Sequence, residues 1–226
     1  MSRAQSRILT ASGLFYQESI GKKVVMAVSG LVLFGFVVGH LAGNLQVYLG
    51  PEVFNGYAAF LRATPALLWG TRFVVLAAVL LHIWSAIQLS LIKRSARPVG
   101  YARWTSMDTS YASRTMMWSG PILAAFIAYH LLHLTFGTVH PSFDHENVYQ
   151  NFIVGFRSFP VVMAYSVSMV MLGMHLRHGI WSMFQTVGFS HATWTPWLKT
   201  AAWIVAVAIV LAYVSMPVAV LAGILR

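Results

Sequence analysis

Five long apolar stretches, separated by short segments that hold most of the charged residues, constrain this chain more than any other feature of its sequence. They cover approximately residues 24–47, 67–92, 115–139, 158–184 and 198–225. Each can cross about 30 Å of hydrocarbon as an α-helix. A content of 58% hydrophobic and 9% charged residues is typical of membrane proteins. We therefore predict an all-α integral membrane bundle of five transmembrane helices, forming one domain over residues 1–226.

The basic residues predict how the bundle is oriented. Lys22 and Lys23 precede the first span, and a second cluster lies between the second and third spans: Lys93, Arg94, Arg97, Arg103 and Arg114. By the positive-inside rule these ends are cytoplasmic, which places the N-terminus in the cytoplasm and the C-terminus outside. The same rule accounts for the formal net charge of +10, so we expect no nucleic-acid partner. The absence of cysteine excludes iron–sulfur ligation by this chain.

Histidines inside the spans are the residues most indicative of function, because ionisable side chains are costly in a membrane. His40 lies 17 residues after Lys23, and His130 lies 16 residues after Arg114. At 1.5 Å per residue both lie roughly 25 Å from the cytoplasmic edge. His82, 11 residues before Lys93, lies roughly 16 Å from that edge. His175, in the cytoplasmic half of its helix, has a similar depth.

Four helices thus each offer an imidazole, in two pairs: His40 with His130, and His82 with His175. Axial ligation of two b haems requires such pairs, one neutral imidazole on either side of each iron. For a single membrane histidine, a hydrogen bond across helices is the simpler explanation. His133 and His178 lie one turn beyond His130 and His175, so depth alone leaves either of them open as a replacement ligand.

Several other residues have a structural interpretation. Gly35, Gly39 and Gly43 form a small-residue face on the first span, and helix packing explains it more simply than a flat cofactor does. His140, His145 and His191 lie outside the spans, and we expect them in solvated loops.

Three sequence motifs carry a resemblance to a known family. They are Gly39-His40-Leu41-Ala42-Gly43-Asn44-Leu45, Tyr129-His130-Leu131-Leu132-His133-Leu134, and His175-Leu176-Arg177-His178-Gly179-Ile180-Trp181-Ser182. Over nearly its whole length the chain resembles the five-helix dihaem cytochrome b subunit of succinate:quinone oxidoreductases, which include quinol:fumarate reductases. The histidine followed by glycine four residues later favours His175 over His178.

The resemblance implies a function, partners and a location. The chain would pass electrons from an iron–sulfur subunit to a membrane quinone, for which we expect menaquinone. His82 and His175 would ligate the proximal haem, and His40 and His130 the distal haem. A flavoprotein with the dicarboxylate site and an iron–sulfur protein would dock on the cytoplasmic face of a bacterial inner membrane. The direction of turnover and assembly into a higher oligomer stay open.

The quinone and the haem propionates need polar partners. Asn44, Gln46 and His133 are candidates for a quinone at the outer end, and Ser29, Gln88 and Trp104 for one beside the proximal haem. Candidate cations for the propionates are Lys22, Lys23, Lys93 and Arg114, although membrane topology alone also explains them. Some quinol-oxidising relatives carry a glutamate where this chain has Gly173, so proton transfer by that residue is not expected.

Two other functions compete with this interpretation. One is the dihaem anchor of a hydrogenase or formate dehydrogenase, against which the fifth span and the His-x-x-x-Gly-x-Trp pattern argue. The other is a haem-free transporter in which buried histidines relay protons. No acidic residue lies within a predicted span and no inverted repeat is present, which disfavours a transporter.

Overall fold

The computed structural model describes residue 16, residues 18–96 and residues 111–226, with side chains from residue 115 onward in the last segment. Within these ranges the chain is helical and contains no strand. Its elements are α2 (Ser19–Leu45), the 3-10 helix η1 (Gln46–Leu49), α3 (Pro51–Ala63), α4 (Pro65–Ser95), α5 (Tyr111–Leu134), α6 (Val148–Gly155), α7 (Phe159–Thr186) and α8 (Thr195–Leu221). Trp104, Arg97 and Arg103 lie outside the described residues.

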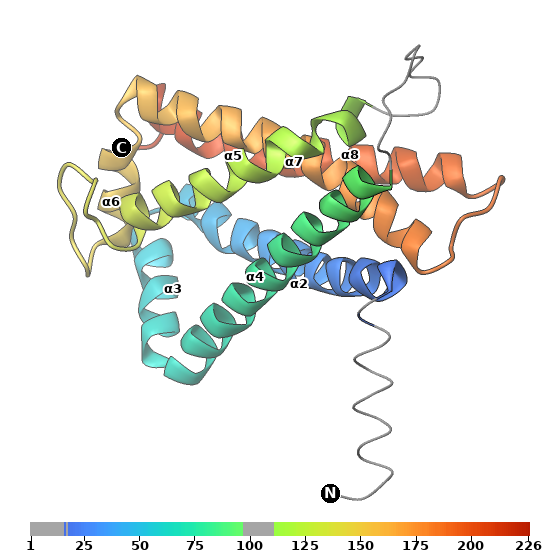
Figure 1. Ribbon diagram of the computed structural model, residues 1–226. Helices are drawn as coiled ribbons and strands as arrows, with labels where there is room; N and C mark the ends of the chain where they lie inside the picture. The colour runs from blue at the N-terminus through green and yellow to red at the C-terminus, as the bar shows by residue number, and fades with distance from the viewer. Residues whose placement is uncertain (1–15, 17, 97–110) are drawn as a thin grey trace, which may run out of the picture.

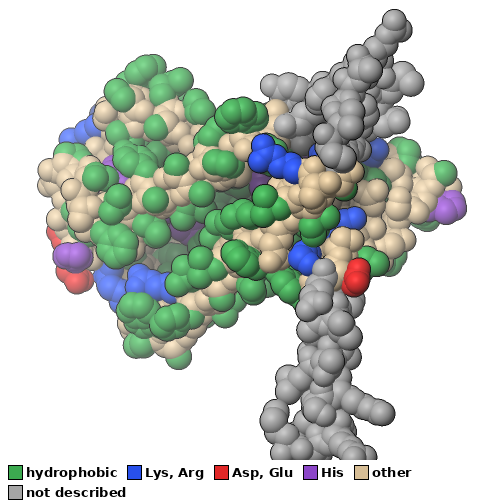
Figure 2. All heavy atoms as spheres, viewed as in Figure 1, with side chains coloured by type: hydrophobic (Ala, Val, Ile, Leu, Met, Phe, Trp, Pro, Cys, Tyr) green, Lys and Arg blue, Asp and Glu red, His purple; other side chains and the backbone are tan. Residues whose placement is uncertain are grey.

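Among the described residues, five helices are long and apolar enough to cross a membrane, as predicted: α2, α4, α5, α7 and α8. Figure 2 shows the corresponding surface, on which hydrophobic side chains cover the middle of the molecule and basic side chains gather toward its two ends. Several of the predicted boundaries shift; for example, α4 is longer at both ends, α5 ends at Leu134 instead of continuing to Val139, and α8 ends at Leu221. The five-helix membrane fold is confirmed.

Proline and glycine determine where several helices begin. Pro51, Pro65, Pro160 and Pro196 each lie in the first turn of a helix, where the missing backbone N–H breaks no helical hydrogen bond. Gly50, with φ of 94°, separates η1 from α3 in a backbone conformation that favours glycine.

Two short helices cover one end of the bundle. In Figure 1, α3 and α6 lie beside each other at this end, together with the C-terminus. The main hydrophobic core also lies here and includes Phe54 of α3, Phe152 and Ile153 of α6, and Tyr165 of α7. We call it the α3/α6 end. The opposite end carries Lys22, Lys23, Lys93, Arg94, Arg177 and Lys199, and we call it the basic end.

The spanning helices pack as neighbours in the pairs α7/α8, α2/α4 and α5/α7, with α2 also contacting α7 and α8. Helix α4 lies against α2 and crosses it at a steep angle in Figure 1. This arrangement brings α2 opposite α5, and α4 opposite α7, which are the helices that carry the four central histidines.

Packing does not explain the glycine face of α2. Gly35 and Gly39 are exposed, and among the described residues a Cβ atom at either would meet no atom within 4 Å. No described helix of this chain therefore packs against these two positions. Gly43 differs, because the ring of Tyr57 on α3 lies close to it: a Cβ atom at Gly43 would lie 2.8 Å from Cε1 of Tyr57. Glycine is needed there because an aromatic side chain of α3 takes the space.

Candidate functional site

Four imidazole rings meet in two pairs inside the bundle. The ring centroids of His40 on α2 and His130 on α5 lie 5.9 Å apart, with 86° between the ring planes. Those of His82 on α4 and His175 on α7 lie 6.0 Å apart, with planes at 58°. These are the pairs that helix depth predicts. The ring that faces His82 is that of His175 and not that of His178.

The separation within each pair suits a metal between two axial imidazoles. Two metal–nitrogen bonds of about 2 Å, plus the distance from each nitrogen to its ring centre, place the centroids about 6 Å apart. Rotation about the metal–nitrogen axis is free, so either interplanar angle is compatible with ligation. No group of three or more metal-binding side chains occurs among the described residues. Two protein ligands per site suit a haem, whose porphyrin provides the other four nitrogens.

The backbone of α2 selects the tautomer of His82. Its Nδ1 lies 3.2 Å from the carbonyl oxygen of Met26 and 3.3 Å from Oγ of Ser29. A carbonyl only accepts hydrogen bonds, so Nδ1 carries the hydrogen and Nε2 has the free lone pair. Ser29 donates its own hydrogen to the carbonyl oxygen of Val25 at 2.7 Å. An acceptor at Nδ1 that leaves Nε2 free is the usual arrangement around a metal-binding histidine.

His175 has a similar neighbour. Its Nδ1 lies 3.4 Å from Oγ of Ser119, whose side chain is fully buried on α5. Ser119 Oγ in turn lies 3.4 Å from the carbonyl oxygen of Met116, to which it can donate. A lone pair of Ser119 is then available to Nδ1 of His175, so both rings of this pair can present Nε2 to each other.

The pair nearer the α3/α6 end is surrounded by aromatic rings. Phe36 stacks on His40 with centroids 5.3 Å apart, and Tyr213 lies at 6.5 Å. The hydroxyl of Tyr165 lies 3.4 Å from Nδ1 of His130 and 3.0 Å from Nδ1 of His133. One hydroxyl can accept from the first ring and donate to the second. Tyr165 therefore connects the paired His130 to its unpaired neighbour.

His133 lies in a second, buried cluster and not opposite His40. Its side chain is 1% exposed and lies between Tyr129, which stacks on it at 5.5 Å, and His140 at 5.3 Å. A Cβ at Gly155 would lie 3.0 Å from its Nε2, so α6 closes over this ring. Burial on all sides makes His133 a poor alternative to His130 as a ligand.

The expectation of a solvated His140 is wrong. The side chain is 9% exposed, because its Nε2 donates to the carbonyl oxygen of Asn151 at 2.8 Å and its Nδ1 accepts from the backbone N–H of Ser142 at 3.0 Å. These bonds hold the connection after α5 against α6. His145 and His191 are exposed, as expected.

The predicted outer quinone residues all lie at the α3/α6 end, and two of them are hydrogen-bonded within the protein. Asn44 donates to the carbonyl oxygen of His40 at 2.7 Å, within its own helix. Gln46 is partly buried in η1, and His133 is bonded to Tyr165. At the other end of the bundle, Gln88 accepts a hydrogen bond from the hydroxyl of Tyr16 at 3.0 Å.

The predicted propionate cations differ in their surroundings. Lys22 is buried, donates to the carbonyl oxygen of Tyr16 at 2.8 Å and lies over its ring. Lys23 and Lys93 are exposed at the basic end. The side chain of Arg114 lies outside the described part of the structure.

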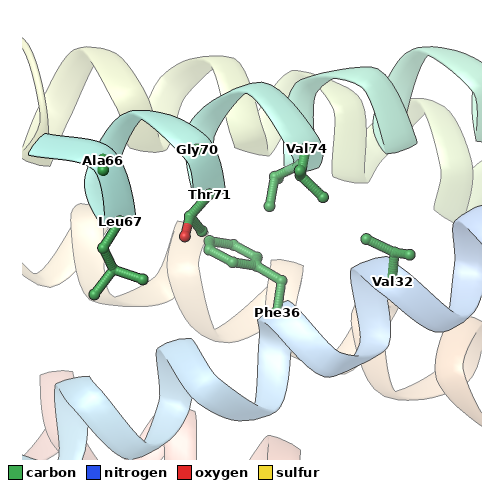
Figure 3. Close-up of a pocket in the computed structure, with 8 residues that line it drawn as sticks. Val32, Phe36, Ala66, Leu67, Gly70, Thr71 and Val74 are labelled. Atoms are coloured by element: carbon green, nitrogen blue, oxygen red, sulfur yellow. The ribbon is translucent and has the colours of Figure 1, made fainter.

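An apolar groove of about 430 Å³ opens between α2 and α4, nearer the α3/α6 end. Figure 3 shows Phe36 of α2 directed toward Thr71 of α4, with Leu67 and Val74 on either side. Phe36 also stacks on His40. This one aromatic side chain therefore lies between the groove and the His40/His130 pair.

Gly173 packs against another helix. A Cβ at this position would lie 2.5 Å from Cγ2 of Val210 on α8. Glycine thus allows close contact between α7 and α8, and a glutamate side chain would not fit there without moving them apart. The acidic residues near the α3/α6 end lie on the surface instead, where Glu146 pairs with Arg62 at 3.3 Å.

Sequence reasoning did not identify Tyr165 and Ser119. Neither belongs to a motif, and serine is common in membrane helices, where its hydroxyl bonds to the preceding turn. The one positional signal was that Tyr165 follows Arg157 at a depth close to that of His130. Ser119 lies only five residues after Arg114, nearer the cytoplasmic edge than the predicted depth of His175.

Comparison with known proteins matched residues 93–214 to the family described as succinate dehydrogenase/fumarate reductase transmembrane subunit. The matched region covers α5, α6, α7 and most of α8, and therefore includes His130, His175, Tyr165 and Ser119. No curated protein and no solved structure gave a significant match.

Proposed function

Because this chain belongs to the family of succinate dehydrogenase/fumarate reductase transmembrane subunits, we propose that it binds two b haems and passes electrons between an iron–sulfur subunit and a membrane quinone. The family and the five apolar helices make it a multi-pass membrane subunit of such a complex. The single observation that carries the haem proposal is the meeting of four histidines from four helices in two pairs with centroids about 6 Å apart.

Each imidazole of the proposal has a defined task. His82 and His175 would hold the proximal haem, and His40 and His130 the distal haem, each through Nε2. The oxygens of Met26 and Ser29, of Ser119 and of Tyr165 would orient three of these rings and increase the basicity of their ligating nitrogens. A haem bound at each pair supplies reversible one-electron chemistry. The protein contributes fixed ligands and an apolar enclosure.

The proposed orientation puts the basic end in the cytoplasm, where a flavoprotein and an iron–sulfur subunit would dock. The His82/His175 pair lies nearer that end, so it would receive electrons first from succinate oxidation and pass them to the His40/His130 pair. Support comes from the positive-inside rule, since Lys22, Lys23, Lys93 and Arg94 lie at the basic end. A complex that reduces fumarate would use the same path in reverse.

We propose that the groove between α2 and α4 takes a quinone, with menaquinone as the expected type. Its apolar walls suit an isoprenoid tail, and Phe36 links it to the ring of His40. Asn44, Gln46 and His133 lie at the same end of the bundle. Because Asn44 and His133 are already hydrogen-bonded within the protein, Thr71 is the polar group in the groove that is best placed for a head group.

A reduced-minus-oxidised visible spectrum, with pyridine haemochrome quantification on the purified protein, tests the proposal. We expect two b haems per chain. His82→Ala and His130→Ala should each lose one, and the two lost haems should differ in midpoint potential. His191→Ala, an exposed histidine, is the control and should retain both.

His133→Ala and His178→Ala test the choice of ligands. Both variants should keep two low-spin haems, because their neighbours His130 and His175 are the rings that face a partner. A wild-type protein without haem would contradict the proposal and favour a transporter. Loss of a haem in His133→Ala, with retention in His130→Ala, would contradict the assignment of the pair.

A further inference from the structure

A second, smaller pocket lies between α7 and α8 near the basic end. It has a volume of about 280 Å³ and is lined by Arg177 of α7 and by Lys199, Thr200 and Trp203 of α8. The ammonium group of Lys199 lies 5.0 Å from the ring centroid of Trp181, one turn beyond Arg177. Two cations, a hydroxyl and the indole ring of Trp203 therefore line one small hollow.

Among the described residues, neither cation has a counter-charge. Arg177 and Lys199 are both exposed, and in the described part of the chain the only ion pair is that of Arg62 with Glu146 at the other end. Both residues lie within helices apolar enough to span the membrane. An unpaired arginine within a span costs about 2.5–3.5 kcal/mol at the helix centre and less toward its end. An anion at this position would remove that cost.

The depth of the pocket indicates which anion it meets. Arg177 lies nine residues before the end of α7 at Thr186, which is about 14 Å along the helix. Lys199 is the fifth residue of α8. The pocket thus opens on the side of the bundle, below the helix ends. Trp203 is 51% and Ile204 55% exposed on α8, as expected for a surface that faces lipid with tryptophan at the membrane interface.

From this placement we infer that the pocket formed by Arg177, Lys199, Thr200 and Trp203 binds the headgroup phosphate of an anionic phospholipid. The guanidinium can bind two phosphate oxygens at once, the ammonium adds a second positive charge, and the Thr200 hydroxyl can donate to a third oxygen. Acyl chains would run along the exposed apolar surface of α8. Basic pockets between transmembrane helices commonly bind such lipids.

A lipid fits this pocket better than a soluble subunit does. Subunits that dock on the basic end would cover the helix ends, whereas this pocket faces sideways at the depth of the lipid headgroups. The inference requires only that the chain spans a membrane, and it is independent of haem binding and of the direction of electron flow.

The test uses the protein purified with its accompanying subunits and reconstituted in nanodiscs of phosphatidylcholine that contain increasing fractions of phosphatidylglycerol. Native mass spectrometry then counts the phosphatidylglycerol molecules that stay bound after release. We expect one tightly held molecule in the wild type. Each neutralised charge should weaken its retention about fivefold, and Arg177→Gln with Lys199→Gln about 25-fold.

Matched variants separate this site from general charge effects. Arg72→Gln is the control, because Arg72 also lies over an indole ring, that of Trp69 at 4.8 Å, but at the opposite end; it should keep the bound lipid. Arg177→Lys with Lys199→Arg retains both charges and should also keep it. Unchanged phosphatidylglycerol binding in the double glutamine variant would overturn the inference. Equal retention of phosphatidylcholine, or loss of soluble subunits without loss of lipid, would overturn it as well.

Discussion

Removal of the Tyr165 hydroxyl, in Tyr165→Phe, tests how the protein holds the His40/His130 pair. The hydroxyl lies 3.0 Å from Nδ1 of His133 and 3.4 Å from Nδ1 of His130. Tyr165 is 6% exposed and His133 1% exposed, so water cannot replace the lost bonds easily. The ring itself stays packed against Phe156, with centroids 4.7 Å apart, and no cavity forms.

The expected cost follows from these contacts. One well-formed buried hydrogen bond contributes about 1 kcal/mol net, and leaving a buried polar atom without a partner costs about 1–3 kcal/mol. We therefore expect Tyr165→Phe to lower the free energy of unfolding by about 2 kcal/mol, a factor of about 30 in the folding equilibrium. If His130 is an axial ligand, its nitrogen also becomes less basic, which raises the midpoint potential of the distal haem and leaves the proximal haem unchanged.

Denaturation monitored by circular dichroism in detergent and a redox titration of both haems measure these two effects. Tyr213→Phe is the matched control, because the Tyr213 hydroxyl donates at 2.8 Å to the carbonyl oxygen of Val37 and not to an imidazole. It should destabilise by about 1 kcal/mol without a change at His130. The reasoning is refuted if Tyr165→Phe matches the wild type in stability, or if it shifts the His82/His175 haem instead.

Two glycine substitutions test close packing. Gly173→Ala places a methyl group 2.5 Å from Val210 Cγ2. It should cost about 1–3 kcal/mol and lower the midpoint of thermal unfolding. Gly179→Ala on the same helix is the control: its methyl group meets no described atom within 4 Å, so the midpoint should not change. Gly155→Ala brings a methyl group within 3.0 Å of His133 and should loosen α6, measured as faster hydrogen exchange over residues 140–155. Equal exchange in wild type and variant would show that the ring moves aside freely.

Composition and spacing were sufficient to predict the spanning helices. A segment of about 20 apolar residues has one stable conformation in hydrocarbon, because only a helix satisfies its backbone hydrogen bonds internally. For the same reason the depth of a residue can be read from its distance to the nearest charged cluster. This is why His40 could be matched with His130, and His82 with His175, before their rings were seen together.

The connections could not be predicted in the same way. The segments at 48–66 and 140–157 contain two helices, α3 and α6, whose stability comes from packing over the end of the bundle and not from their own periodicity. His140 was expected in solvent but is buried, because its partner is a backbone carbonyl of α6. Because every residue has a backbone carbonyl, the sequence does not show which residue provides such a contact.

The sequence by itself therefore determined the class of fold, the number of spans and the depth of each imidazole, since these depend on local composition and on the fixed rise of a helix. The tertiary structure decided which of two neighbouring histidines faces a partner, which hydroxyl bonds to each ring, and why residue 173 is glycine. These features depend on how the helices are rotated and how closely they approach, which many side chains set together.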